Sequence, residues 1–173
     1  ILLKELRIEL PGMRLLLTHG TATGRAEGEK LLQPGDLQVW QPWDTRGAVR
    51  RFLRQFRPAI GILMETEIWP NLMAAAARRQ LPVVLANARL SRRSARGYAR
   101  IAALVRPALE RLAAVAAQSE ADANRLALLG APRISICGNL KFDVSPAPAA
   151  LALGETWRAA LGARPVWLAA STR

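Results

Sequence analysis

The sequence predicts an α/β protein with a Rossmann-like parallel sheet that helices cover on both faces. Short, continuous apolar runs alternate with segments of helical periodicity, which is the pattern of parallel strands joined by crossover helices. Turns that lead into these runs are plain and mostly contain proline, whereas the turns that leave them carry polar side chains. Because parallel strands all end at one edge of their sheet, we expect the ligand site at that edge.

Composition narrows the class of protein further. The 173 residues fit one domain, or one domain and the beginning of a second, and 51% of them are apolar, which suffices for a sizeable core. Cys137 is the single cysteine, which excludes an internal disulfide and a multi-cysteine metal site; in its apolar run we expect it to be buried. The net charge of +12 favours anionic partners, meaning an acidic membrane surface, a phosphorylated substrate or nucleic acid. No zinc finger or RNP signature is present, so nucleic acid is the weakest of these.

The chain begins with the pattern of a helix over residues 1–10, followed by a strand at 15–17. The strand runs into a turn of small and hydroxyl residues in which Thr21, Thr23 and Gly24 can cradle an anion, although such a turn also simply connects a strand to a helix. His19 is the single histidine and makes a poor metal site. The turn lacks the spacing of a dinucleotide fingerprint or a P-loop.

A second strand at 37–40 precedes a clearly amphipathic helix. Its apolar residues fall at i, i+3, i+4 and i+7, from Val49 to Phe56, and either Asp44 or Thr45 is expected to cap it.

The third strand, 59–64, leads directly into Glu65 and Glu67, and proline stands in the first turn of the helix that follows. Two carboxylates at the end of a core strand are placed for chemistry. The alternative is that one of them caps the helix or faces water, since acids are favoured at helix N-termini.

The fourth strand, 83–86, is followed by polar side chains that form a candidate anion or sugar-hydroxyl site, namely Asn87, Arg89, Ser91 and Ser94. Guanidinium groups bind phosphate bidentately, but a capped helix with a solvated basic face explains the same residues equally well. Basic residues recur every four positions from Arg92 to Arg100, with an apolar stripe beyond them that either lies on an anionic membrane or packs in the core. Pro107 is expected to divide or kink this helix.

The last part of the chain contains two more strands and a change in composition. Strand 113–117 leads into Gln118 and Ser119 at the start of a helix that ends at Gly130, and strand 134–137 follows. The stretch 145–150 is rich in proline and alanine and is typical of a linker; a helix at 157–161 and a strand at 166–170 come after it. We therefore expect one domain over 1–144 and the start of a second over 145–173.

Four ordered motifs resemble one known family. They are residues 64–71; Asn87 to Ser91 with Ser94 and Tyr98; Gln118 and Ser119 with Asp122 and 129–131; and 138–143. Together they resemble the N-terminal half of the 3-deoxy-D-manno-octulosonic acid (Kdo) transferases, GT-B glycosyltransferases of lipopolysaccharide assembly. The resemblance extends from residue 15 to 173 and includes a Thr-x-Thr-Gly turn at 21–24, although His19 departs from the usual residue.

The resemblance implies transfer of Kdo from CMP-Kdo to the 6'-hydroxyl of a lipid A precursor, with inversion, on the cytoplasmic face of the inner membrane. It implies no metal and no cofactor in the transfer. The family's proposed base, a glutamate in a Ser-x-Gly-Glu turn, has no counterpart here, so the catalytic residue is unassigned and we expect the chain alone to be inactive.

The resemblance also implies roles for residues of this chain. Glu65 and Glu67 line the acceptor side, where they either orient the acceptor or support the base; the resemblance does not decide which residue has which role. The implied substrate-binding residues are Thr21, Thr23, Gly24, Asn87, Arg89, Ser91, Ser94, Gln118, Ser119, Asn139 and Lys141, the last two at an interdomain cleft. The alternatives are another GT-B glycosyltransferase that uses a nucleotide-activated sugar, and a non-catalytic module of the same fold that binds anions or membranes.

Overall fold

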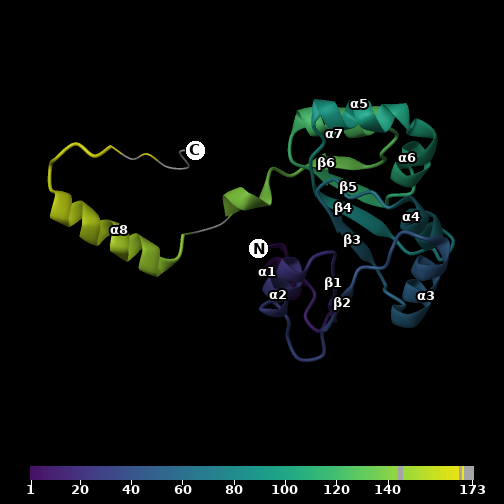
Figure 1. Ribbon diagram of the computed structural model, residues 1–173, viewed down its shortest axis with the longest axis horizontal. Helices are drawn as coiled ribbons and strands as arrows, with labels where there is room; N and C mark the ends of the chain where they lie inside the picture. The colour runs from purple at the N-terminus through teal and green to yellow at the C-terminus, as the bar shows by residue number, and fades with distance from the viewer. Residues whose placement is uncertain (144–145, 168, 170–173) are drawn as a thin grey trace. The chain divides into compact units, whose positions relative to one another are not determined.

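The computed structural model describes residues 1–143, 146–167 and 169, and it divides into two compact units, Ile1–Leu140 and Lys141–Arg173. The first unit is an α/β structure with parallel strands, which confirms the predicted fold class (Figure 1). Its elements are α1 (Leu2–Glu9), β1 (Leu16–His19), α2 (Ala22–Glu29), β2 (Leu37–Trp40), α3 (Arg46–Phe56), β3 (Gly61–Met64), α4 (Pro70–Ala77), β4 (Val83–Ala88), α5 (Arg92–Arg100), α6 (Ala102–Leu109), β5 (Ala114–Ala117), α7 (Glu120–Leu128) and β6 (Ile134–Ile136).

The strands form two parallel sheets where one was expected. β1 pairs with β2, and a separate sheet has the order β3-β4-β5-β6. Every crossover in the second sheet is a helix, as parallel pairing requires. In the described part of the chain, no strand of one sheet is hydrogen-bonded to a strand of the other, and β1 and β3 each have one edge without a strand partner.

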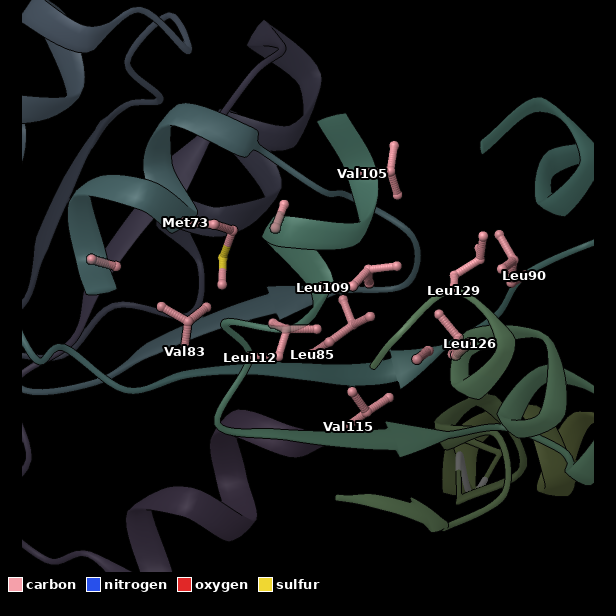
Figure 2. Packing of buried hydrophobic residues seen from close by; sticks show 13 residues of the cluster. Met73, Val83, Leu85, Leu90, Val105, Leu109, Leu112, Val115, Leu126 and Leu129 are labelled. Carbon is pink, nitrogen blue, oxygen red and sulfur yellow. The ribbon is translucent and has the colours of Figure 1, made fainter. Parts of the chain in front are cut away.

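The main core lies on one face of the four-stranded sheet. Leu63, Leu85 and Val115 are in register across three strands and therefore share this face. Helices α4, α6 and α7 cover it, and their side chains converge on Leu85 and Val115 in Figure 2. Each fully buried leucine contributes about 1.5–3 kcal/mol through removal of apolar surface from water.

The expectation that helices cover both faces is wrong for the described residues. Side chains alternate along a strand, so Ile62 and Met64 of β3 point away from the core, and they are 39% and 40% exposed. The reason is that α4, α6 and α7 all contribute to the same core cluster, while α3 packs on α4 through Val49 and Leu53. The amphipathic pattern of α3 was thus predicted correctly.

Two local predictions differ from the structure. The break between α5 and α6 falls at Ile101, whose backbone leaves the helical region, and Pro107 lies inside α6. In so short a helix the proline costs one backbone hydrogen bond, which the buried packing of Val105 and Leu109 offsets. Cys137 is exposed because it directly follows β6, an edge strand with mostly exposed side chains.

A partly buried ion pair holds α1 against the β1–β2 sheet. Arg7 donates to Asp36 at 2.6 Å, and Asp36 also accepts the backbone N–H groups of Leu15 and Gln33. Burial raises the pKa of Asp36, but the Arg7 hydrogen bond and charge and the two backbone donors lower it below its usual range.

The second unit contains a long helix. The 3₁₀ segment η1 (Leu140–Asp143) begins at the last residue of the first unit, and α8 (Pro148–Leu161) follows. The predicted linker at 145–150 therefore extends too far, because Pro148 stands in the first turn of α8, where proline is favoured. In the predicted strand at 166–170, residues 166, 167 and 169 have no regular structure and the others lie outside the described residues. No described residue of the second unit forms a strand that could pair with residues 166–170.

Candidate functional site

The candidate site is the carboxyl edge of the four-stranded sheet, which we define by Glu65, Glu67, Asn87, Gln118 and Asn139. The first four residues follow or end the adjacent strands β3, β4 and β5. The backbone continues the ladder past the strand ends, because Glu65 N–H donates to the Ala86 carbonyl and Gln118 N–H to the Ala88 carbonyl, both at 2.9 Å. The topology thus brings residues that are distant in sequence to one edge, as the sequence predicts.

Two residues at this edge have left-handed backbone conformations. Glu65 has φ 58° and Asn87 has φ 50°, at the ends of neighbouring strands. For a residue with a side chain this conformation costs about 1–2 kcal/mol, less for asparagine, and it turns the chain sharply out of the sheet. Such strain persists only where the surrounding structure holds it, and it is typical of functional sites.

Asn87 is the centre of a hydrogen-bond network that joins three strand ends. Its carbonyl accepts the Gln118 side-chain amide at 2.9 Å, and its Oδ1 accepts the Leu140 N–H at 3.2 Å. Gln118 Oε1 in turn accepts the Asn139 amide at 2.9 Å. All these residues belong to the first unit. The structure therefore brings together three of the predicted substrate-binding residues and fixes their amides relative to one another.

The turn of Glu65 and Glu67 presents two exposed carboxylates beside this network. Glu67 accepts the Trp69 indole N–H at 3.3 Å, and the turn is held from α5, where the Tyr98 hydroxyl donates to the Thr66 carbonyl at 3.0 Å. Burial, and then the negative charge of Glu67, raise the pKa of Tyr98. Neither carboxylate caps α4 through its side chain, which rules out the capping half of the alternative, but both glutamates are exposed, as its other half expected.

Arg89 and Ser91 lie on a segment that α7 clamps. Between them, Leu90 is fully buried; its N–H donates to Asp122 Oδ1 at 2.9 Å and its carbonyl accepts the Arg125 guanidinium. Asp122 also accepts the Ser119 hydroxyl and is paired with Arg125 at 3.0 Å. Burial raises the pKa of Asp122, but the hydrogen bonds and the Arg125 charge lower it below its usual range.

The hydroxyl residues of this region have capping contacts. Ser91 caps α5 by accepting the Ser94 N–H at 3.1 Å, and the two hydroxyls lie 2.9 Å apart. Ser119 caps α7 in the same way. Arg89 is exposed, and no described acid pairs with it. A role of these residues toward substrate stays a prediction.

The predicted anion turn lies in the other sheet, at the end of β1. Thr21 caps α2 by accepting the Gly24 N–H at 3.1 Å, so this donor is already used, while Thr23 is exposed in the first turn. His19 is partly buried, and its ring contacts the Gln38 amide at 2.9 Å. A side chain at Gly28 would overlap that ring, so glycine leaves the space it needs. Among the described residues, no hydrogen bond or ion pair joins this turn to Glu65 or Asn87.

The remaining site prediction falls in the second unit. Lys141 lies in η1, with its ammonium 5.0 Å from the Phe142 ring centre. Among the described residues, no group of three or more His, Cys, Asp or Glu side chains could hold a metal ion. In that same part of the chain, no helix combines the length and apolar character needed to cross a bilayer.

Asp44 is a positioning residue whose contact with α4 the sequence did not reveal. The sequence left open whether Asp44 or Thr45 caps α3, and in the structure Thr45 does. Asp44 instead accepts the N–H groups of Asn71 and Leu72 at 3.0 and 2.8 Å. The Asn71 amide donates back to the Asp44 carbonyl at 2.6 Å. Asp44 thus caps α4 from another element, and it fixes the helix that follows the two glutamates. The sequence offers one signal of this external cap: α4 begins after Trp69, whose side chain cannot cap a helix.

The fold and the carboxyl edge define the class of protein as an α/β protein of parallel strands whose polar groups gather where the strands end. Comparison with known proteins then identifies the family. The model of the family described as 3-deoxy-D-manno-octulosonic-acid transferase (kdotransferase), N-terminal glycosyltransferase region, matches residues 1–144. The chain belongs to this family.

Individual relatives agree with this assignment. The chain is 47% identical to the 3-deoxy-D-manno-octulosonic acid transferase of Bordetella pertussis over 167 residues, which cover 94% of this chain and 39% of that protein. It is 33% identical to the enzyme of the same name from Haemophilus influenzae, over 99% of this chain and 41% of that protein. A bifunctional glycosyltransferase/methyltransferase of Fusobacterium nucleatum is 31% identical over 78% of the chain and 22% of that protein. The chain thus spans about two fifths of the first two relatives.

Proposed function

We propose that this chain supplies the acceptor side of an enzyme that transfers Kdo from CMP-Kdo to a lipid A precursor, a step of lipopolysaccharide assembly. The observation that carries the proposal is the family match over residues 1–144, which includes every element of the carboxyl edge. The names of the relatives specify Kdo as the transferred group. The identity of the donor nucleotide and of the acceptor goes beyond those names and belongs to the proposal.

The proposed reaction is an inverting transfer. A sugar hydroxyl of the acceptor attacks the anomeric carbon of Kdo, its proton passes to a carboxylate base, and CMP leaves with the electron pair of the broken carbon–oxygen bond. Within this chain we assign Glu65 and Glu67 to hydrogen bonds with acceptor hydroxyls, for which exposed carboxylates are suited. We assign the base itself to no residue of this chain. No metal or cofactor takes part in the proposed transfer.

The carboxyl edge supports this assignment through its rigidity. Asn87, Gln118 and Asn139 hold one another by hydrogen bonds, so amide groups at this edge are oriented before a ligand arrives. Donors that are fixed in advance lose little entropy on binding, and they stabilise a developing negative charge better than mobile ones do. Arg89, Ser91 and Ser94 are proposed to bind phosphate or sugar groups of the substrates. Lys141, in the second unit, is proposed separately as a substrate-binding residue.

We also propose that the enzyme works at the cytoplasmic side of the inner membrane, on the anionic surface that contains its lipid acceptor. The support is the net charge of +12, since a basic protein accumulates at an anionic surface without a membrane-spanning helix.

The test is a transfer assay with the full-length protein that contains this chain, CMP-Kdo and a tetra-acylated lipid A precursor, with the lipid analysed by mass spectrometry. We expect a mass gain of one or more Kdo units. A gain only with a different nucleotide sugar would assign another GT-B activity, and a folded protein that transfers nothing would leave the non-catalytic module as the function.

A further inference from the structure

The excess positive charge of the chain is concentrated in one stretch. Residues 45–109 contain 13 arginines, no lysine and only two acids, Glu65 and Glu67, so they carry +11 of the net charge of +12. This stretch forms helices α3 to α6. Three ion pairs occur in the described residues, and none involves an arginine of this stretch. Within the part of the chain that the structure describes, the positive charge of this stretch therefore has no acidic partner.

Six of these arginines line a groove between α3 and α4, which pack against each other at the side of the sheet (Figure 1). We call it the arginine groove. One lobe, about 490 Å³, lies beside the C-terminal ends of the two helices, and the other, about 660 Å³, lies beside the N-terminal half of α3 and along α4. Arg79 lines both lobes; the other arginines are Arg46, Arg50, Arg54, Arg57 and Arg78.

Helix stability does not explain these positions. Arginine near a helix C-terminus interacts favourably with the helix dipole, which accounts for Arg54 and Arg78. Arg46 is the first residue of α3, where positive charge is unfavourable, and no acid lies in that first turn. Arg46, Arg50 and Arg54 also follow one another at intervals of four residues, so that like charges repel along one helix face. A bound anion would relieve both effects.

The groove is shaped and partly fixed for such a ligand. Ala74 and Ala75 of α4 form part of the lining of the larger lobe, and Ala75 also packs in the core between the two helices. Arg79 donates to the Arg50 carbonyl at 3.4 Å, which holds its guanidinium across the groove where the two lobes meet. No Asp or Glu lines either lobe.

We propose that the arginine groove is a second anion site, distinct from the carboxyl edge, that binds a ligand with two or more phosphate groups. Guanidinium groups pair with phosphate oxygens bidentately, and two lobes that share Arg79 fit two linked or neighbouring phosphates. Such phosphates come either from a soluble polyphosphate or from lipid headgroups. This proposal does not depend on the transfer reaction, because it rests on a different part of the molecule.

The experiment measures binding of inorganic tripolyphosphate by titration calorimetry and of phosphatidylglycerol vesicles by sedimentation. The test variant is Arg50→Gln/Arg54→Gln/Arg79→Gln, and the matched control is Arg92→Gln/Arg93→Gln/Arg96→Gln on α5, which removes the same charge from exposed positions outside the groove. We expect the groove variant to lose about tenfold or more in affinity, since each lost contact is a hydrogen bond to a charged group. The control is expected to stay within about threefold.

A third variant, Ala74→Leu, fills the groove without changing charge, and it is expected to weaken binding of the same probe. Binding of tripolyphosphate would assign a soluble ligand, and binding of vesicles alone would assign lipid headgroups. Equal losses in the two triple variants, wild-type affinity in Ala74→Leu, or a wild-type chain that binds neither probe would each overturn the proposal. Circular dichroism tests whether each variant is folded. If the groove triple variant does not fold, Ala74→Leu still tests the proposal.

Discussion

Asp122 is the residue on which the geometry around Arg89 and Ser91 depends. It is 6% exposed, and its carboxylate accepts hydrogen bonds from the Leu90 backbone and the Ser119 hydroxyl besides its ion pair with Arg125. A buried carboxylate costs desolvation energy that only such partners offset. The sequence placed Asp122 in a family motif, but its contact with Leu90, 32 positions earlier, became visible only in the structure.

Replacing this residue gives the first prediction. Asp122→Ala is expected to lower the free energy of unfolding at pH 7 by about 1.5–3 kcal/mol, because hydrogen bonds to a buried charge are lost. Urea unfolding measures the effect, with Glu120→Gln in the exposed first turn of the same helix as the control. An Asp122→Ala midpoint equal to that of the control would show that the clamp contributes nothing.

The same contact predicts a pH dependence. The folded-state pKa of Asp122 is lowered, so its carboxylate stabilises the fold at pH values above the ordinary aspartate pKa, about 3.9. That contribution is lost as the pH falls through the lowered folded-state pKa. The difference in unfolding free energy between wild type and Asp122→Ala should therefore shrink below about pH 4. A difference that stays constant down to pH 2 would contradict the lowered pKa.

Tyr98 offers a direct test of the turn that carries the glutamates. It is the single tyrosine of the chain, so its hydroxyl can be titrated by ultraviolet absorbance without overlap from another tyrosine. Burial and the charge of Glu67 raise its pKa above the ordinary value of about 10. Glu67→Gln should lower the Tyr98 pKa toward that value, whereas Glu120→Gln should not. An unchanged Tyr98 pKa in Glu67→Gln would mean that the two side chains are not close in solution.

At the scale of elements, α4 depends on a cap that comes from outside the helix. Asp44→Ala removes the acceptor of two backbone N–H groups at the start of α4 and is expected to cost about 1–2 kcal/mol of stability, as loss of a strong N-cap does. Thr45→Ala removes the cap of α3, a longer contact of 3.4 Å, and should cost less. Thermal or urea unfolding of the two variants compares them. The opposite order would contradict the assignment of Asp44 to α4.

The elements themselves were largely predictable because their signals are local. Apolar runs gave the strands, i to i+4 periodicity gave α3, and small polar residues marked the starts of α5 and α7. The predictions that failed concern features that depend on contacts between residues distant in the sequence. The division into two sheets, the exposure of Ile62 and the exposure of Cys137 all depend on which segments lie beside a strand, and one sequence does not encode that locally.

The sequence predicted the site in the same way, locating its residues but not the contacts between them. That Asn87, Gln118 and Asn139 share an edge follows from strand order, but the hydrogen bonds that join them and the left-handed turn at Glu65 could not be read from the residues. Most of the predicted hydroxyl residues proved to have capping contacts as well, since a helix start and an anion site use the same side chains. Sequence alone does not separate the two roles.

At the scale of the whole molecule, the charge predicts how the protein behaves near membranes. The full-length protein should bind vesicles that contain phosphatidylglycerol and should not bind vesicles of neutral lipid. Binding should fall steeply as the salt concentration is raised, because the Debye length shortens to about 8 Å at physiological ionic strength. Sedimentation at increasing sodium chloride concentration measures this. Binding that does not respond to salt would show that charge is not what attracts the protein to the surface.

The central claim is that the carboxyl edge forms the acceptor side of a Kdo transferase, and Glu67→Gln in the full-length protein tests it most directly. The measurement is kcat/KM for transfer from CMP-Kdo, with Glu120→Gln as the control and circular dichroism to show that each variant is folded. We predict a loss of at least about tenfold in Glu67→Gln, the size expected when one charged hydrogen bond to a substrate is removed. Wild-type kcat/KM in a folded Glu67→Gln enzyme would contradict the claim.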